Sequence, residues 1–180
     1  DHPGIFSLAD KVIIENNLLQ CERSCGFISG DEYLIRNNTF ESNEQFIQFN
    51  GRNSIIEDNQ FGSSPSYGCG VNIGDEYNYA ENVSFSKNKV DSEFGGNLYG
   101  NRCKIIDCEF SGWDGIAITG NENIINNSIF YSTGHTMVIW LTGDNCEIIN
   151  NSLYGGSPGQ GGSIIQIYGS NNILSGNTIQ

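Results

Sequence analysis

Asp114 and His135 carry a carboxylate and an imidazole, two side chains that serve as general acids and bases in enzymes. They precede corresponding strands in consecutive copies of a repeat, so a fold that stacks the repeats brings both toward Trp140. This placement predicts a candidate catalytic acid/base pair. The alternative is that both are polar residues on surface corners.

A second set of residues has the chemistry of sugar recognition. They alternate with apolar residues along short strands, so they point outward, and they are amides and aromatics with almost no charge. Sugar rings stack on Tyr and Trp, and sugar hydroxyls pair with Asn and Gln. The predicted substrate-binding residues are Gln48, Asn72, Asn97, Tyr99, Trp140, Gln166 and Tyr168. The alternative is an ordinary solvated sheet face rich in Thr and Asn.

Four carboxylates follow corner glycines of nearby repeats. Hard cations prefer clustered carboxylate oxygens, so these side chains predict a calcium site, and calcium is the one cofactor that the sequence raises. The predicted metal ligands are Asp31, Glu32, Asp75 and Glu76. The alternative is a salt-bridged column in which Arg52 stacks between Asp31 and Asp75.

A repeat must position all of these residues. The repeated motif is an apolar residue, two residues of any kind, a position that is usually Asn, one residue of any kind and a second apolar residue. It occurs eight times, and its first residues lie 21, 21, 29, 20, 19, 24 and 26 residues apart. A period of this length indicates a solenoid. The copies are Ile14/Asn17/Leu19, Ile35/Asn38/Phe40, Ile56/Asn59/Phe61, Phe85/Asn88/Val90, Ile105/Cys108/Phe110, Ile124/Asn127/Ile129, Ile148/Asn151/Leu153 and Leu174/Asn177/Ile179.

A second phrase, in which two apolar residues alternate with others before a Gly, lies between these copies. Ile116-Ala117-Ile118-Thr119-Gly120 is a clear example. Alternation at period two predicts a strand with one buried face, and Gly permits a sharp corner. Stacked coils would align the apolar residues and place the Asn residues in a column at a bend, which Cys108 interrupts.

These patterns predict one all-β domain over residues 1–180, a right-handed parallel β-helix of about eight coils. Neither end shows an amphipathic helix that would cap an exposed coil. We therefore expect a segment of a longer solenoid, or a homo-oligomer that assembles end to end or laterally. Insertions lengthen single coils at residues 62–69, 75–82 and 155–162, as solenoids do to build binding walls.

Composition excludes several partners. The net charge is −13 with only eight Lys and Arg, which argues against nucleic acid and would repel an acidic polysaccharide. No apolar run is long enough to insert into a membrane. Of six cysteines, Cys103, Cys108 and Cys146 are expected to be buried free thiols, while Cys21 and Cys25 flank a loop and are candidates for a local disulfide.

The phrase from Gly115 to Gly120, followed by Asn123-Ile124-Ile125-Asn126-Asn127, resembles the parallel β-helix of the pectate-lyase-like superfamily and NosD-like repeats. Residues 33–40 also resemble the lyase family typified by chondroitinase B. That family's catalytic Lys and Arg lie on the next strand, where this chain has Phe46-Ile47-Gln48-Phe49-Asn50-Gly51. Neither residue type is present there, so the resemblance does not carry over lyase chemistry.

Together these features predict an extracellular, periplasmic, cell-surface or virion-surface β-helix that binds polysaccharide without catalysis. Two alternatives remain. One is a polysaccharide lyase, hydrolase or epimerase with an atypical site. The other is a self-assembling fibre or tailspike-like protein.

Overall fold

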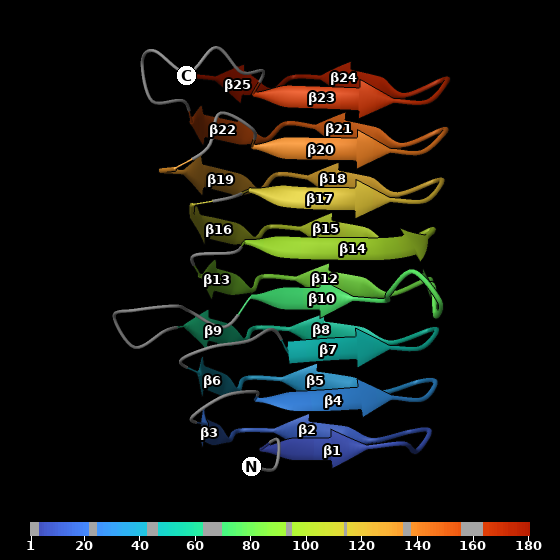
Figure 1. The fold of residues 1–180 in the computed structure, drawn as a ribbon, viewed down its shortest axis with the longest axis vertical. Helices are drawn as coiled ribbons and strands as arrows, with labels where there is room; N and C mark the ends of the chain where they lie inside the picture. Colours follow the sequence, from blue (N-terminus) through green and yellow to red (C-terminus); the bar gives the residue numbers. More distant parts are fainter. Residues whose placement is uncertain are drawn as a thin grey trace.

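The computed structural model describes residues 4–21, 25–42, 47–62, 70–92, 95–113, 115–134, 138–155 and 164–180. Its described residues form β-strands and turns and no helix. Each coil contributes one strand to each of three parallel sheets, and the coils stack from the N-terminus (blue) to the C-terminus (red) in Figure 1. Within the described residues each sheet carries one strand from each of eight coils.

We name the sheets A, B and C in the order in which the chain meets them. Sheet A contains β1 (Ile5–Ser7), β4 (Gly26–Ser29), β7 (Ile47–Asn50), β10 (Val71–Ile73), β14 (Gly96–Asn101), β17 (Ile116–Thr119), β20 (Ile139–Thr142) and β23 (Ile165–Tyr168), and the short β11 (Ala80–Glu81) pairs with β14. Sheet B contains β2 (Ile13–Glu15), β5 (Leu34–Arg36), β8 (Ile55–Glu57), β12 (Ser84–Ser86), β15 (Lys104–Ile106), β18 (Ile124–Asn126), β21 (Glu147–Ile149) and β24 (Ile173–Ser175). Sheet C contains β3 (Leu18–Cys21), β6 (Thr39–Ser42), β9 (Gln60–Gly62), β13 (Lys89–Asp91), β16 (Glu109–Gly112), β19 (Ile129–Ser132), β22 (Ser152–Gly155) and β25 (Thr178–Ile179).

The predicted parallel β-helix is confirmed. Strands of two to six residues cannot bury an apolar face alone. Stacking solves this because each coil hydrogen-bonds to the coils above and below and hides its inward side chains among theirs. The stability of any coil therefore depends on its neighbours.

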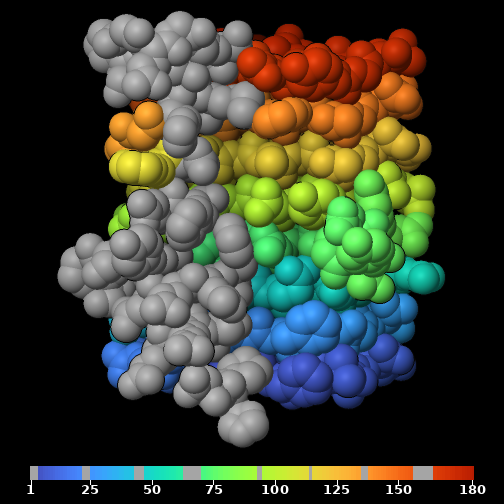
Figure 2. All heavy atoms as spheres, viewed as in Figure 1, coloured from blue at the N-terminus to red at the C-terminus, as the bar shows by residue number. Residues whose placement is uncertain are grey.

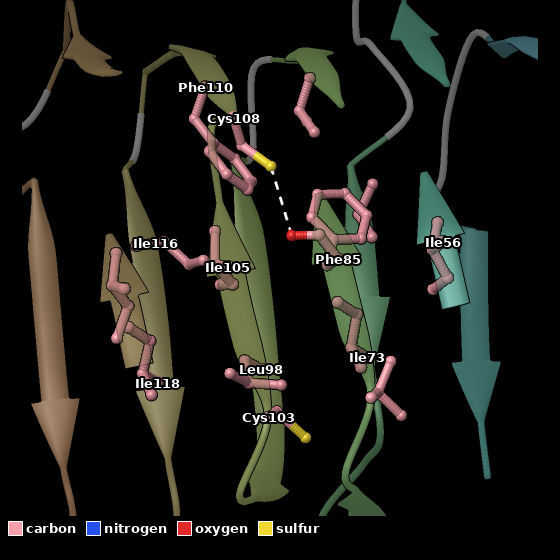
Figure 3. Close-up of a cluster of buried hydrophobic side chains, with 14 of the residues drawn as sticks. Ile56, Ile73, Phe85, Leu98, Cys103, Ile105, Cys108, Phe110, Ile116 and Ile118 are labelled. Carbon is pink, nitrogen blue, oxygen red and sulfur yellow. Dashed lines mark hydrogen bonds between the residues drawn. The ribbon is translucent and has the colours of Figure 1, made fainter. Parts of the chain in front are cut away.

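Inward side chains form continuous columns. On sheet C, Phe40 and Phe61 stack with ring centroids 5.0 Å apart, and Phe110 and Phe130 are 5.1 Å apart. Phe85 of sheet B lies between these pairs, 5.9 Å from Phe61. All five rings are buried, and Figure 3 shows Phe85 and Phe110 among the aliphatic residues of the same interior. Ring stacking stabilises the fold in addition to the burial of apolar area.

The Asn residues form the predicted column at the corner between sheets B and C. Asn38 Nδ2 lies 3.0 Å from Asn59 Oδ1, and Asn59 Nδ2 lies 3.1 Å from Asn88 Oδ1. Each amide also donates to carbonyl groups, as Asn59 does to Ile35 and Glu57 at 3.0 and 2.9 Å. The column thus satisfies backbone groups that the corner removes from the sheets.

Cys108 interrupts this amide column, as predicted, but it preserves part of the bonding. Its Sγ donates to the carbonyl oxygens of Phe85 at 3.5 Å and Ile106 at 3.2 Å, the same two kinds of acceptor that an Asn amide uses in this column. Figure 3 shows the bond to Phe85 as a dashed line. A thiol is a weak donor, but here it takes over the donor role of the missing amide.

The predicted position of the sixth copy of the repeat was wrong by one residue when compared with the strand register of the structure. Ile125, not Ile124, pairs with Ile105 and Ile148 in the inward column and is fully buried. Ser128 then occupies the Asn position, and its backbone N donates to Asn151 Oδ1 at 2.9 Å. Side chains alternate along a strand, so the one-residue shift turns Ile124 to the outside of sheet B.

The cysteines described by the structure are free thiols. Cys103, Cys108 and Cys146 are buried, as predicted, and burial raises the pKa of the Cys108 thiol to about 12. Cys21 is also a free thiol, so the candidate disulfide between Cys21 and Cys25 does not form, and Cys25 donates to the carbonyl oxygen of Glu41 at 3.0 Å. Burial, together with a hydrogen bond that the Cys21 thiol donates to Cys25, raises the pKa of Cys21 to about 11.

The last coil lacks the cover that inner coils receive. Leu174 and Ile179 are 45% and 52% exposed, whereas their counterparts Ile148 and Leu153 one coil earlier are fully buried. No helix caps either end among the described residues. The described residues also include no helix with the length and apolarity needed to cross a membrane.

Candidate functional site

The outer face of sheet A is built by two rows of stacked side chains. The inward residues between them, such as Ile28, Phe49 and Leu98, are buried, so alternation directs both rows to the outer side of the sheet. We call this surface the neutral face, because its residues carry no charge. The first row consists of Phe6, Phe27, Gln48, Asn72, Asn97, Ala117, Trp140 and Gln166, and the second contains Ser29, Asn50, Tyr99, Thr119, Thr142 and Tyr168.

The structure brings all seven predicted substrate-binding residues onto this face. Gln48, Asn72, Asn97, Trp140 and Gln166 lie in the first row. Tyr99 and Tyr168 lie in the second row. Their shared face follows from the parallel pairing of β7, β10, β14, β20 and β23 within one sheet.

Amides occupy the middle of the neutral face and hold one another in place. Asn97 Nδ2 donates to Asn72 Oδ1 at 2.8 Å, and Gln48 Nε2 donates to the Gly74 carbonyl at 2.8 Å. Within the described residues, no partner is seen for the Asn72 amide donors or for Asn97 Oδ1. These groups are therefore fixed in position and available to a ligand, which lowers the entropy that binding costs.

Aromatic rings occupy the C-terminal end of the neutral face. Trp140 is 43% exposed and Tyr168 is 55% exposed, and their ring centroids lie 6.2 Å apart with an interplanar angle of 44°. Trp140 Nε1 donates to Thr142 Oγ1 at 3.2 Å, which orients the indole. An oriented ring loses little freedom when a second flat surface stacks on it.

A second aromatic pair lies at the N-terminal end of the same face. The rings of Phe6 and Phe27 stack with centroids 5.7 Å apart and an interplanar angle of 22°. The neutral face thus runs from one aromatic pair, through a band of amides, to another aromatic pair.

A groove lies beside the amide band. The chain between β10 and β11 projects beyond the carboxyl ends of the sheet A strands (Figure 1) and forms the green ridge on the right of Figure 2. Beneath it is an open cavity of about 590 Å³, whose lining includes Tyr77 and Tyr79. Ser29 and Asn50 line this groove and also belong to the neutral face, so the two surfaces are continuous.

Asp75 fixes the ridge. Its carboxylate accepts hydrogen bonds from the backbone N of Tyr77 at 2.8 Å, the backbone N of Asn78 at 2.7 Å and the Asn50 amide at 3.0 Å. Burial acts to raise the pKa of Asp75, but these bonds outweigh it because they favour the charged form, and the pKa is lowered. The insertion is thereby tied to sheet A through Asn50.

The charged residues of the groove neutralise one another. Glu81 forms ion pairs with Arg102 and with Arg52, whose Nε lies 3.9 Å from the Glu81 carboxylate. Asp31 accepts a hydrogen bond from the Arg52 backbone N at 2.9 Å. The alternative prediction that Arg52 bridges Asp31 and Asp75 by its side chain was wrong, because Glu81 in the inserted segment takes that guanidinium.

Three of the predicted calcium ligands engage protein partners. Asp31 and Asp75 accept the hydrogen bonds given above, and Glu32 pairs with Lys11 at 3.8 Å. The fourth, Glu76, is exposed. No group of three or more His, Cys, Asp and Glu residues that could hold a metal ion occurs within the described residues. Calcium binding by these residues stays a prediction from sequence.

Asp114 and His135, the predicted acid/base pair, lie outside the described residues. The contribution of Tyr77, Tyr79, Glu81 and Arg102 to a groove was not predicted. For Tyr77, Tyr79 and Glu81 the signal was the insertion over residues 75–82, which predicted a binding wall, whereas Arg102 lies in the next coil and gave no such signal. The fold of that wall depends on contacts with Asn50 and Arg52, two coil positions that the insertion itself does not reveal.

Comparisons with known proteins give one structural likeness and no family. No protein-family model and no curated protein sequence matches the chain. The structure is similar to that of the Streptococcus pneumoniae surface protein and adhesin PfbA, with a TM-score of 0.42 and 10% sequence identity. The match covers 86% of this chain and 69% of that one.

Proposed function

We propose that the neutral face binds an uncharged polysaccharide, without catalysis, on a protein located outside the cell or on a cell or virion surface. The observation that carries this proposal is the absence of charge from both described rows of the face, in a chain whose net charge is −13. Amides and aromatic rings fill the places that charged residues take elsewhere on the molecule.

The periodicity of the face suits a periodic ligand. Stacked coils repeat about every 4.8 Å, so the amide band and the aromatic pairs present similar groups at regular intervals. An extended polymer of sugars can place successive residues against successive coils. Many weak contacts then act together on one chain, which raises the overall affinity without any single strong site.

Charge selects the kind of polysaccharide. The negative field of the whole protein repels uronate or sulfate groups at a distance. The amides of the neutral face can hydrogen-bond to the hydroxyl groups of a sugar whether or not that sugar also carries a charge. The arginines of the adjoining groove are engaged by Glu81, so they offer an acidic sugar little attraction.

Affinity electrophoresis against a panel of neutral and acidic polysaccharides tests the proposal. Trp140→Ala with Tyr168→Ala removes the aromatic end of the face, and we expect the retardation by neutral polymers to fall at least tenfold, since stacking anchors the sugar rings. Tyr131→Ala with Tyr154→Ala is the matched control. These rings stack at 4.8 Å on sheet C, away from the neutral face.

Equal retardation of both double variants would overturn the assignment of the face. The same polysaccharides, after incubation with the protein, also test the claim of no catalysis. Release of unsaturated ends or reducing ends that disappears in Asp114→Asn or His135→Gln would instead establish an enzyme that uses the predicted acid/base pair.

A further inference from the structure

The outer face of sheet B differs from the neutral face. It also has two columns of outward side chains, but these combine charges with isoleucines. The first column reads Ile13, Leu34, Ile55, Ser84, Lys104, Ile124, Glu147 and Ile173, and the second reads Glu15, Arg36, Glu57, Ser86, Ile106, Asn126, Ile149 and Ser175, from coil 1 to coil 8.

The pattern in coils 5 to 7 is symmetric about coil 6. In the first column Lys104 and Glu147 flank Ile124, and in the second column two isoleucines flank Asn126. If the order of the three coils is reversed, Lys104 and Glu147 exchange places, and every apolar position still holds an isoleucine. A surface with this property is complementary to a reversed copy of itself.

The two charges have no ion-pair partner within the described part of the chain. Every described salt bridge involves other residues, such as Lys89 with Glu109 at 3.1 Å in adjacent coils. Lys104 and Glu147 are two coils apart, about 9.6 Å along the stack, with Ile124 between them. No ion pair joins Lys104 to Glu147 among the described residues.

We propose that a second copy of this chain binds here, as a lateral dimer with antiparallel solenoid axes. The two-fold axis runs along β18. Lys104 of each copy then faces Glu147 of the other, and Ile124 faces its own counterpart. In the second column Ile106 faces Ile149 in the same way. Both apolar contact and charge complementarity thus select a single alignment.

The equivalent arrangement at coils 1 to 3 is disfavoured. An axis along β5 would place Arg36 against Arg36 and Glu15 against Glu57 of the other copy. Arg36 there already pairs within the chain, with its Nε 2.7 Å from Glu15. Isoleucines are present in both regions, so the charges rather than the apolar residues decide where the second copy binds.

The predicted contact is small. Three residues across and three coils along give a strip of about 10 Å by 14 Å, well below the 800 Å² or so that each partner contributes to a standard interface. We therefore expect a weak, rapidly exchanging dimer that is populated at high protein concentration and low ionic strength.

Charge reversal tests the alignment. Sedimentation velocity over a concentration series should show wild-type dimerisation that Lys104→Glu and Glu147→Lys each weaken at least tenfold, because like charges then meet twice. The double variant Lys104→Glu/Glu147→Lys exchanges the charges and should restore wild-type association. Single variants that associate as the wild type does, a double variant that stays weak, or a wild type that remains monomeric throughout would each overturn the proposal.

Cross-linking locates the axis independently. Ile124→Cys places two thiols at the two-fold axis, so a short bis-maleimide should join two copies. Ile55→Cys is the matched control from the same column. Three coils from the axis, its thiols would be about 29 Å apart and should not react across the dimer. Equal cross-linking of both variants would overturn the alignment, and polysaccharide binding by the neutral face is measured separately.

Discussion

The inward faces of sheets A and B are alike in chemistry, whereas their outward faces differ in charge and apolarity. The inward residues of both are large and apolar, as in Phe49 of sheet A and Ile56 of sheet B, which are fully buried. Outside, the two rows of the neutral face of sheet A carry no charge, whereas sheet B carries isoleucines with charges of both signs. Stacking fixes the inward residues because each must fit its neighbours, but it leaves the outward residues free. The fold therefore does not require the distinct chemistry of each surface, and the proposed ligand and the proposed second copy each account for one of the two surfaces.

The largest expected effect comes from breaking what the two sheets share. Phe61→Ala removes a buried ring that contacts both Phe40 and Phe85. We expect a loss of about 3–5 kcal/mol in the free energy of unfolding, measured by chemical denaturation. Tyr131→Ala, which removes an outward ring, should cost less than about 1 kcal/mol. Equal losses would show that inner and outer rings contribute alike.

The Asn column should be the next most sensitive part. Asn59→Ala leaves the buried Asn38 backbone N without its acceptor and removes a side-chain donor from the carbonyl groups of Ile35 and Glu57, and we expect a loss of about 1–3 kcal/mol in the free energy of unfolding. Asn59→Cys should recover part of this loss, because Cys108 bonds the same kinds of carbonyl in its own coil. Denaturant midpoints of the three proteins measure this, and an Asn59→Cys protein no more stable than Asn59→Ala would contradict it.

A single charge on the neutral face should sharpen its difference from sheet B. Thr119→Asp adds a carboxylate between Tyr99 and Thr142 of the same row. We expect the stability to change by less than about 0.5 kcal/mol because the position is at the surface. Retardation by neutral polysaccharides should fall several-fold as a solvated charge enters the contact. Serine at the same position is the control and should bind as the wild type does.

The smallest effect should be the response of the ridge to pH. The pKa of Asp75 is lowered in the folded protein, so the hydrogen bonds to its carboxylate are fully present above the ordinary value of about 3.9. They are lost as the pH falls through the lowered value. The amide signals of Tyr77 and Asn78 should therefore titrate together in an NMR series below the ordinary pKa. Titration at or above it would contradict this account.

The sequence predicted the fold because the stacked columns need a regular phrase, and it predicted the neutral face because alternation alone decides which residues point outward. It failed at coil 6 for a definite reason. Ile124, Ile125, Asn126 and Asn127 fit the phrase in two registers one residue apart, and only pairing with Ile105 chooses between them. The repeat pattern did not predict the groove either, because its Arg52–Glu81 ion pair joins a residue of a regular coil to a residue of an insertion.

The Asn column also bears on how the molecule resists force. Side-chain amides bond from coil to coil between Asn17 and Asn88 and again between Asn151 and Asn177, but Cys108 and Ser128 occupy the two coils between. Tension along the stack is therefore borne by fewer strong bonds at coils 5 and 6 than on either side. We expect these two coils to separate first when a single molecule is stretched along its axis.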